Sequence, residues 1–194
     1  MDDTPDPAQN LIRFGWEEWV ALPDLGLPAI KAKIDTGART SALHASVIEP
    51  FGPASAPQVR FLIQPDPNNP NLEITCSAAV VDRREVTSSN GDTELRYVIE
   101  TIAQMGSRKW PIQLTLTNRE NMMYRMLFGR GAILPDMIVN ANASFLQPKL
   151  DYSPYAGLPK RKPVKRPLRI ALLTAGIGLF AYFIYNADPA KIRA

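Results

Sequence analysis

The sequence predicts an all-β domain over residues 11–150, a linker at 151–167 and one transmembrane helix at 168–186. Short apolar or alternating runs, separated by Pro, Gly and Asn turns, are typical of strands in a closed or sandwich-like β domain. One uncharged run near the C terminus has nearly the length of a membrane helix. The acidic residues 1–10 are expected to be disordered, and residues 187–194 form a short tail.

Strand character recurs through the predicted domain. Residues 16–22 are largely apolar and end at a Pro-Asp-Leu-Gly turn, and residues 30–34 alternate between apolar and polar side chains. Alternation with a period of two indicates a strand with one buried face. Further strands are expected at 59–63, 78–81 and 112–116, and only 131–139 and 41–45 favour short helices.

A hairpin is predicted over residues 84–101. Two strand-like runs flank the turn Asn90-Gly91-Asp92. Asn-Gly strongly indicates a hairpin, because both of its residues tolerate positive φ. The hairpin is therefore expected to project the turn Asn90-Gly91-Asp92.

The predicted transmembrane helix centres on residues 170–185, which contain no charge. At about 1.5 Å per residue this run spans roughly 24 Å, slightly less than a hydrocarbon core of about 30 Å. A buried core helix is the alternative. Six Lys and Arg residues precede the run and two follow it. The positive-inside rule then predicts a single-pass protein of the cell inner membrane, with its folded domain in the cytoplasm. The acidic, polar start of the chain is unlike a signal peptide.

Charge and composition limit the partners and cofactors. The net charge is +3, and the basic residues concentrate at 160–169, so the folded part gives no sign of nucleic-acid binding. The sequence has one Cys and one His. An intrachain disulfide is thereby excluded, and a zinc site would have to rely mostly on carboxylates. We therefore expect no metal and no cofactor, and we expect Cys76 to be a packed apolar side chain.

The segment Asp35-Thr36-Gly37-Ala38 is the leading candidate for chemistry. Alone, Asp-Thr-Gly is most often a surface turn. Here it follows the alternating run at 30–34, and Gly37 permits close approach of another backbone. Late in the domain, apolar residues precede Gly129-Arg130.

Longer stretches around these motifs carry a resemblance to a known family. They comprise Lys-Ala-Lys-Ile-Asp-Thr-Gly-Ala-Arg-Thr-Ser-Ala-Leu-His-Ala at 31–45, residues 15–23, residues 83–86 with Ser89 and Gly91, and residues 127–130. This sequence resembles the bacterial retropepsin-like family associated with ribosomal-protein glutamate ligases of the ATP-grasp type. The resemblance implies a closed β-barrel with a short helix and aspartic endopeptidase activity. That family often carries the label "ATP-dependent zinc protease", but no P-loop is found, so only "protease" has support here.

The resemblance also implies roles for individual residues. Asp35 would be the catalytic acid or base, Thr36 would hydrogen-bond across a dimer, and Gly37 would admit substrate or partner backbone. The hairpin would be a flap that closes over the substrate. The substrate-binding residues would be Ala38, Arg39, Ser89, Asn90 and Gly91. Aspartic proteases need two carboxylates that share a proton, and the sequence has one Asp-Thr-Gly. The second Asp35 would therefore come from a homodimer partner.

Several basic residues leave alternatives open. Arg39 is expected to lower the pKa of the Asp35 pair, to bind a substrate carboxylate, or to form an ion pair with Glu85 or Glu94. His44 is interpreted as structural in preference to catalytic. Four further arginines are expected to lie on solvated strand faces; if they face the cleft, they favour an acidic peptide such as a poly-glutamate tail. They are Arg83, Arg84, Arg96 and Arg125.

Two functions of different class remain at this point. The first is an aspartic endopeptidase acting on a peptide or protein substrate, with a link to glutamate ligases. The second is a non-catalytic module that holds a peptide or a ligase at the membrane. Proximity of two Asp35 carboxylates would favour the first, and a lone exposed Asp35 would favour the second.

Overall fold

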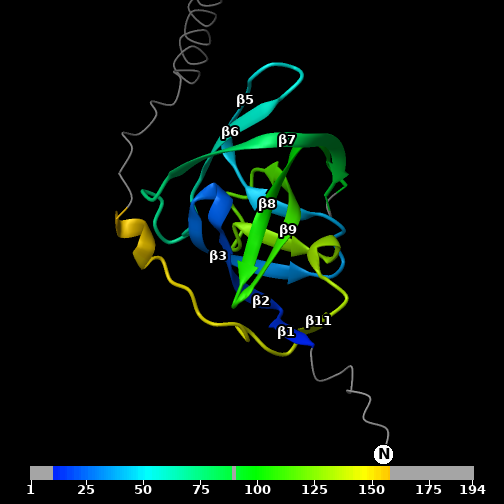
Figure 1. Cartoon of the computed structure of the whole chain (residues 1–194), viewed down its shortest axis with the longest axis vertical. Coiled ribbons are helices and arrows are strands. Elements are labelled where there is room, and N and C mark those ends of the chain that lie inside the picture. Colours follow the sequence, from blue (N-terminus) through cyan, green and yellow to red (C-terminus); the bar gives the residue numbers. More distant parts are fainter. Residues whose placement is uncertain (1–10, 89–90, 158–194) are drawn as a thin grey trace, which may run out of the picture. The chain divides into compact units, whose positions relative to one another are not determined.

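The computed structural model describes residues 11–88 and 91–157, which form two β-sheets (Figure 1). The strands are β1 (Ile12–Gly15), β2 (Glu17–Leu22), β3 (Leu27–Asp35), β4 (Ser41–His44), β5 (Ser46–Phe51), β6 (Gln58–Ile63), β7 (Ile74–Thr87), β8 (Thr93–Met105), β9 (Arg108–Thr117), β10 (Met126–Gly129) and β11 (Met137–Asn140). Short 3₁₀ turns are η2 (Pro23–Leu25), η3 (Arg130–Ala132) and η4 (Ser153–Gly157).

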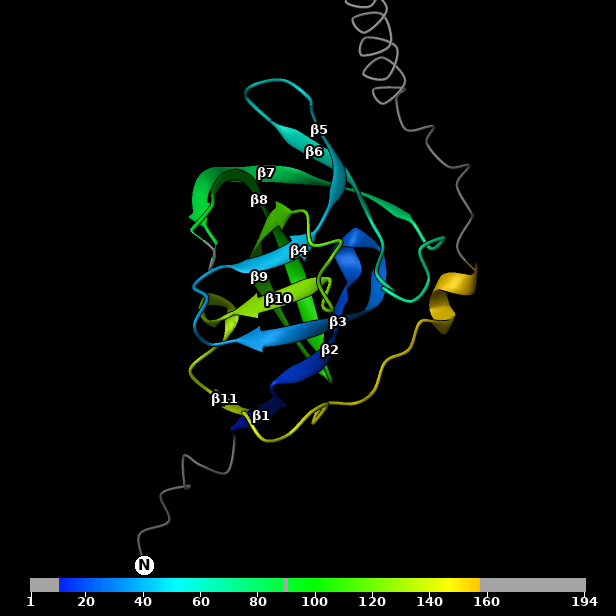
Figure 2. The same cartoon turned by 180° about the vertical axis from the view of Figure 1, so that it is seen from behind.

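Six strands close into a barrel in the order β2-β3-β10-β4-β9-β8. The closing contact is the antiparallel pair of Ala21 in β2 with Gln104 in β8. β7, β6 and β5 continue the sheet beyond β8, and β5 and β6 project away from the barrel (Figure 2). The parallel pair of β1 and β11 forms a separate two-stranded sheet. The predicted all-β class with a closed barrel is confirmed.

The barrel interior is filled by the apolar positions of the alternating strands. In β3, Ile30, Ala32 and Ile34 are buried, whereas the intervening lysines are not. Burying an Ile side chain contributes about 1.5–3 kcal/mol. Cys76 is also buried, as predicted, and burial raises the pKa of its thiol to about 12. Over residues 30–34 the core therefore follows the period-two pattern of the sequence.

The predicted hairpin is confirmed, but the two predicted helices are wrong. β7 and β8 are antiparallel, from the pair of Val80 with Ile99 to the pair of Thr87 with Thr93. Ser41–His44, which was expected to be helical, is a strand between β9 and β10. Pairing on both sides supplies the backbone hydrogen bonds that a helix would otherwise make internally. In 131–139, helical structure is limited to η3, and Met137–Asn140 pairs with β1. Pro135 interrupts the segment, because its ring clashes with the backbone of a helical residue before it and so keeps Leu134 out of helical geometry.

The packed domain continues past residue 150. Tyr155 in η4 is buried, and its hydroxyl donates to the carbonyl of Ala29 at 2.7 Å. Tyr152 packs edge-on against Trp19, with ring centroids 5.2 Å apart. The first residues of the predicted linker are thus a strap that covers the start of β3.

The transmembrane helix predicted at 168–186 lies outside the residues that the structure describes. Within the described part of the chain, no helix has the length and apolar character needed to span a bilayer.

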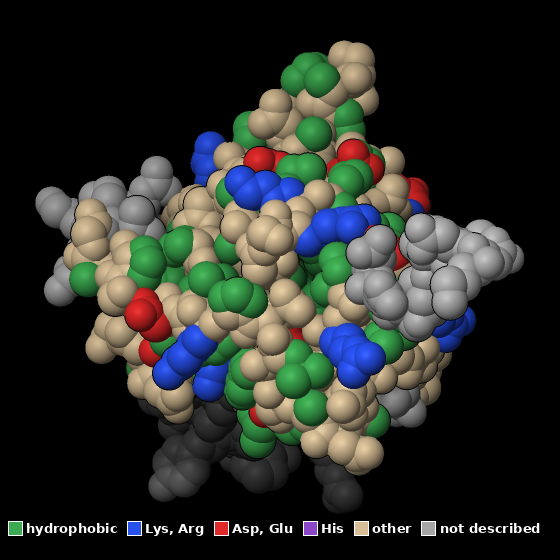
Figure 3. Space-filling model, turned by 60° about the horizontal axis from the view of Figure 1, so that its bottom comes forward, with side chains coloured by type: hydrophobic (Ala, Val, Ile, Leu, Met, Phe, Trp, Pro, Cys, Tyr) green, Lys and Arg blue, Asp and Glu red, His purple; other side chains and the backbone are tan. Residues whose placement is uncertain are grey.

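One face of the molecule, shown in Figure 3, carries Lys and Arg side chains that are separated by hydrophobic and neutral ones.

Candidate active site

Asp35 is the last residue of β3, at the point where the chain leaves the barrel for a tight loop. It lies opposite Gly129 in the parallel pair of β3 with β10. Its Oδ1 accepts hydrogen bonds from the backbone N–H groups of Gly37 and Ala38, both at 3.0 Å. The carboxylate therefore organises its own loop through one oxygen. Oδ2 has no hydrogen-bond donor among residues 11–88 and 91–157.

The segment Gly129-Arg130-Gly131 holds this loop from the opposite side. Arg130 donates from its backbone N–H to the carbonyl of Ala38 at 2.8 Å and from Nη1 to the carbonyl of Gly37 at 2.7 Å. The N–H of Gly131 donates to the carbonyl of Arg39 at 3.0 Å. The two motifs, in which Gly37 and Arg130 are 93 residues apart in the sequence, are thus one structural unit.

Close packing explains the glycine at 129. A Cβ at this position would lie 2.6 Å from the carbonyl carbon of Thr40 and 3.0 Å from the carbonyl oxygen of Ala38. The N–H of Gly129 also donates to Oγ of Ser41 at 3.1 Å. Only glycine lets β10 approach the loop this closely.

The other predicted site residues are exposed or partly buried, or they lie outside the described part. Thr36, Gly37 and Arg39 are exposed in the single chain, and Ala38 is partly buried. Ser89 and Asn90 are outside the described residues. Gly91 has φ +89°, as the predicted turn requires, and its N–H donates to the carbonyl of Ser88 at 3.0 Å.

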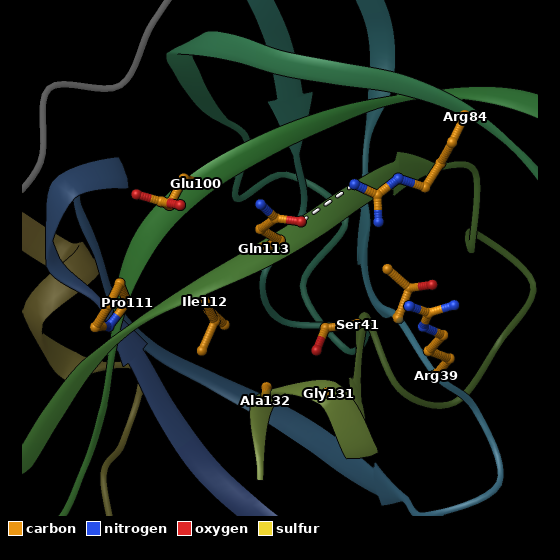
Figure 4. A pocket seen from close by; sticks show the side chains of 10 residues that line it. Arg39, Ser41, Arg84, Glu100, Pro111, Ile112, Gln113, Gly131 and Ala132 are labelled. Atoms are coloured by element: carbon orange, nitrogen blue, oxygen red, sulfur yellow. Dashed lines mark hydrogen bonds between the residues drawn. The ribbon is translucent and has the colours of Figure 1, made fainter. Parts of the chain in front are cut away.

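A pocket of about 300 Å³ lies beside the Asp35 loop, between η3 and strands β8 and β9 (Figure 4). Arg39 and Arg84 face it from different elements, and Glu100 lines its far end. Arg84 is fixed by Gln113, at 3.2 Å from Nη2 to Oε1, and by an ion pair with Asp82 at 2.8 Å. Arg39 has no ion pair with any described residue, and Glu94 instead pairs with Arg96. The pocket thus combines two guanidinium groups with the Glu100 carboxylate, and of the two arginines only Arg39 lacks an ion pair with a described residue.

The strand register divides the hairpin arginines between two faces. Arg84 pairs with Arg96 across β7 and β8, so both side chains lie on one face of the hairpin. Arg83 pairs with Tyr97 and stacks on its ring, with its guanidinium carbon 4.7 Å from the centroid. Because successive side chains in a strand alternate, Arg83 lies on the opposite face. The expectation that all four arginines lie on solvated strand faces is wrong for Arg125, which is buried.

His44 and Arg125 are buried side by side behind the site. They lie opposite each other at the ends of β4 and β10, where the N–H of His44 donates to the carbonyl of Arg125 at 2.7 Å. His44 Nδ1 accepts from the N–H of Arg119 at 3.0 Å. Burial, and then the Arg125 charge, lowers the pKa of His44 to about 4. His44 is therefore neutral at pH 7 and supports the loop between β9 and β10.

Sequence reasoning missed Arg119, which lies in that loop. Burial, and then the charge of Arg96, lowers its pKa, while the charge of Asp35 acts in the opposite direction. No local motif marks Arg119, because its contact with His44 depends on the register of β9, β4 and β10.

The donor groups present do not suggest a metal centre. Within 11–88 and 91–157, no three His, Cys, Asp or Glu side chains are close enough together to hold a metal ion.

Comparison with known proteins identifies relatives of this fold and site. Residues 13–150 match the family described as "Retropepsin-like aspartic endopeptidase RimB". Proteins named "Probable alpha-L-glutamate ligase" are 42% identical over 177 residues in Shewanella pealeana and 42% identical over 175 residues in Parasynechococcus marenigrum. These matches cover 90% and 88% of this chain but only 38% and 37% of the relatives, so the chain spans about two fifths of their length.

A solved structure shares the fold. A Legionella pneumophila protein of unknown function has a TM-score of 0.55 and 27% sequence identity. The match covers 69% of this chain and 96% of that one.

Proposed function

Because the chain belongs to the RimB-like family of retropepsin-like aspartic endopeptidases, we propose that it hydrolyses peptide bonds with a pair of Asp35 carboxylates. The observation that carries the proposal is the Asp35 loop, closed by Gly129, Arg130 and Gly131 at the end of a barrel strand. In such a pair one carboxylate takes a proton from water, and the other, protonated, polarises the scissile carbonyl.

The second carboxylate comes from a second copy of the chain. Each chain supplies one Asp-Thr-Gly, and a two-fold axis through the loops would bring two Asp35 side chains together. The exposure of Thr36 and Gly37 supports this arrangement, because both residues are available to a partner. The hairpin of β7 and β8 serves as the flap.

The substrate that suits the site is an acidic peptide. Arg39 and Arg84 face the pocket beside Asp35, and Arg96 lies on the same hairpin face as Arg84. The relatives are named glutamate ligases. We therefore propose that the chain cleaves glutamate-rich peptides, the class of product that a glutamate-ligating reaction supplies.

Replacement of Asp35 tests catalysis and assembly together. Asp35→Asn should abolish cleavage of a glutamate-rich peptide without unfolding the domain. When equal amounts of wild-type and variant chains exchange freely, activity should fall to about one quarter of that of the same total amount of wild-type protein, because both copies must carry Asp35. A value of about one half would show that each chain acts alone, and unchanged cleavage by Asp35→Asn would exclude the proposed chemistry.

A binding module is the second candidate. The relatives' printed names describe a ligase and no peptidase, which fits a domain that holds the acidic peptide for ligation. In that case Asp35→Asn would leave function intact, whereas loss of Arg39 and Arg84 would weaken peptide binding.

We also propose that residues 168–186 anchor the protein in the inner membrane, with the folded domain in the cytoplasm. The support is the uncharged run at 170–185 with its basic flank. Tethering would raise the local concentration of chains and favour the dimer. Release of the full-length protein from membranes by alkaline carbonate would exclude the anchor.

A further inference from the structure

Glu100 is the acidic residue at the far end of the pocket beside the Asp35 loop. It lies opposite Gln113 in the antiparallel pair of β8 with β9, so the two side chains share one face of the sheet. Gln113 accepts a hydrogen bond from Nη2 of Arg84 and lines the same pocket, so this shared face is the pocket side. Figure 4 shows Glu100 and Arg39 on opposite sides of the pocket. The pocket is therefore acidic at one end and basic at the other.

The charges at the two ends of the pocket are available to a ligand. Among residues 11–88 and 91–157, neither Arg39 nor Glu100 has an oppositely charged group at ion-pair distance. Arg84 also lines the pocket, but it is already paired with Asp82 at 2.8 Å. A ligand in the pocket thus meets one unpaired cation, in the loop that follows Asp35, and one unpaired anion at the far end.

A pocket with separated opposite charges favours a ligand that carries the complementary charges in the matching order. A carboxylate of the ligand suits Arg39, because a guanidinium can bind it with two parallel hydrogen bonds. At the other end, Glu100 repels a second carboxylate and attracts an ammonium group. The repulsion matters as much as the attraction, because it disfavours ligands that carry acidic groups alone.

We infer that Glu100 is a specificity-determining residue, which binds an ammonium group of the substrate while Arg39 binds a carboxylate of the same substrate. The ammonium group is the free amino terminus of an acidic peptide or the side chain of a Lys beside an acidic residue. This assignment rests on the proposed acidic-peptide function and narrows it, because the preferred peptide carries both charges.

Calorimetry on the full-length Asp35→Asn protein measures peptide binding without cleavage. The three probes are tetraglutamate with a free amino terminus, N-acetyl-tetraglutamate, and N-acetyl-tetraglutamate extended by one Lys. At least one of the two ammonium-bearing peptides should bind about three- to fivefold more tightly than the N-acetylated one, as expected for an exposed ion pair. Preference for the first probe identifies an amino terminus, and preference for the third identifies a Lys side chain. Equal affinity for all three would overturn the assignment.

Substitution of Glu100 assigns the preference to this side chain. Glu100→Gln removes the charge but keeps the shape, so the preference for an ammonium group should disappear, and Glu100→Asp should retain part of it. Because Glu100 is exposed, neither change should unfold the domain. Glu49→Gln is the matched control, since Glu49 is an exposed carboxylate on β5, which projects away from the barrel (Figure 2). A preference that survives in Glu100→Gln, or that Glu49→Gln also removes, would refute the role of Glu100.

Arg39→Gln examines the other end of the pocket. All three peptides should bind this variant more weakly, because each carries the carboxylates that Arg39 binds. The preference for an ammonium group should remain, because Glu100 is still present. Unchanged affinity would refute the carboxylate end of the assignment.

Binding separates failure of this assignment from failure of the proposed function. If the wild-type chain cleaves no peptide but the ammonium preference depends on Glu100, the peptidase proposal fails and the Glu100 site stands. If cleavage depends on Asp35 but the preference is absent, the Glu100 site fails.

Discussion

A methyl group added at residue 129 should disturb the Asp35 loop directly. In Gly129→Ala the new Cβ would lie 2.6 Å from the carbonyl carbon and 2.7 Å from the carbonyl oxygen of Thr40, and ordinary contact begins at 3.4 Å. These are backbone atoms, so no side chain can move aside. β10 and the loop must separate by roughly 0.8 Å, which is an overpacking change.

The magnitude follows from the contacts that this separation stretches. Overpacking costs about 1–3 kcal/mol, and each weakened hydrogen bond of the loop adds up to about 1 kcal/mol. We expect a loss of about 3 kcal/mol in the free energy of unfolding, or a fall of roughly 6–12 °C in Tm. Displacement of Asp35 by this amount should lower kcat about 100-fold.

The assay combines thermal unfolding with cleavage of a glutamate-rich peptide. Gly157→Ala is the control, because a Cβ there meets no atom within 4 Å. Unfolding at the wild-type temperature together with wild-type cleavage would refute the reasoning. The unfolding measurement is informative whether or not the chain is a peptidase.

Three other predictions concern stability and reactivity. Burial and the Arg125 charge lower the pKa of His44 from 6.5 to about 4, so between these pH values the unfolded chain binds a proton that the folded chain does not. The free energy of unfolding should therefore fall by about 3 kcal/mol as pH drops through this range. Denaturant titrations at several pH values should show a weaker pH dependence of this free energy for His44→Asn than for wild type, and identical pH dependences would contradict the prediction. Cys76, with its pKa raised to about 12, should resist iodoacetamide at pH 8 until the domain is unfolded, and labelling of the native protein would count against the buried environment. Tyr155→Phe removes the bond to the Ala29 carbonyl and should cost about 1–2 kcal/mol, whereas an unchanged urea midpoint would show that the strap does not stabilise the domain.

The strand pattern of the sequence predicts the position of Asp35 in the fold, but not the partners of its strand. Alternation at 30–34 places Ile34 inside the barrel and Asp35 at the strand end, and both follow from a local period of two. No helix formed at 41–45, and in 131–139 only the 3₁₀ turn η3 formed, because pairing with β9, β10 and β1 outweighs local preference. Short apolar segments are ambiguous until their partners are known.

The sequence by itself determined the all-β class, the hairpin at Asn90-Gly91 and the identity of the Asp35 and Gly129-Arg130 motifs, because each depends on neighbouring residues. The tertiary structure alone decided that Arg130 closes the Asp35 loop and that His44 and Arg125 lie behind Arg119. It also separated Arg84 from Arg83. These relations depend on strand register, since a shift of one residue turns every side chain of a strand to the other face.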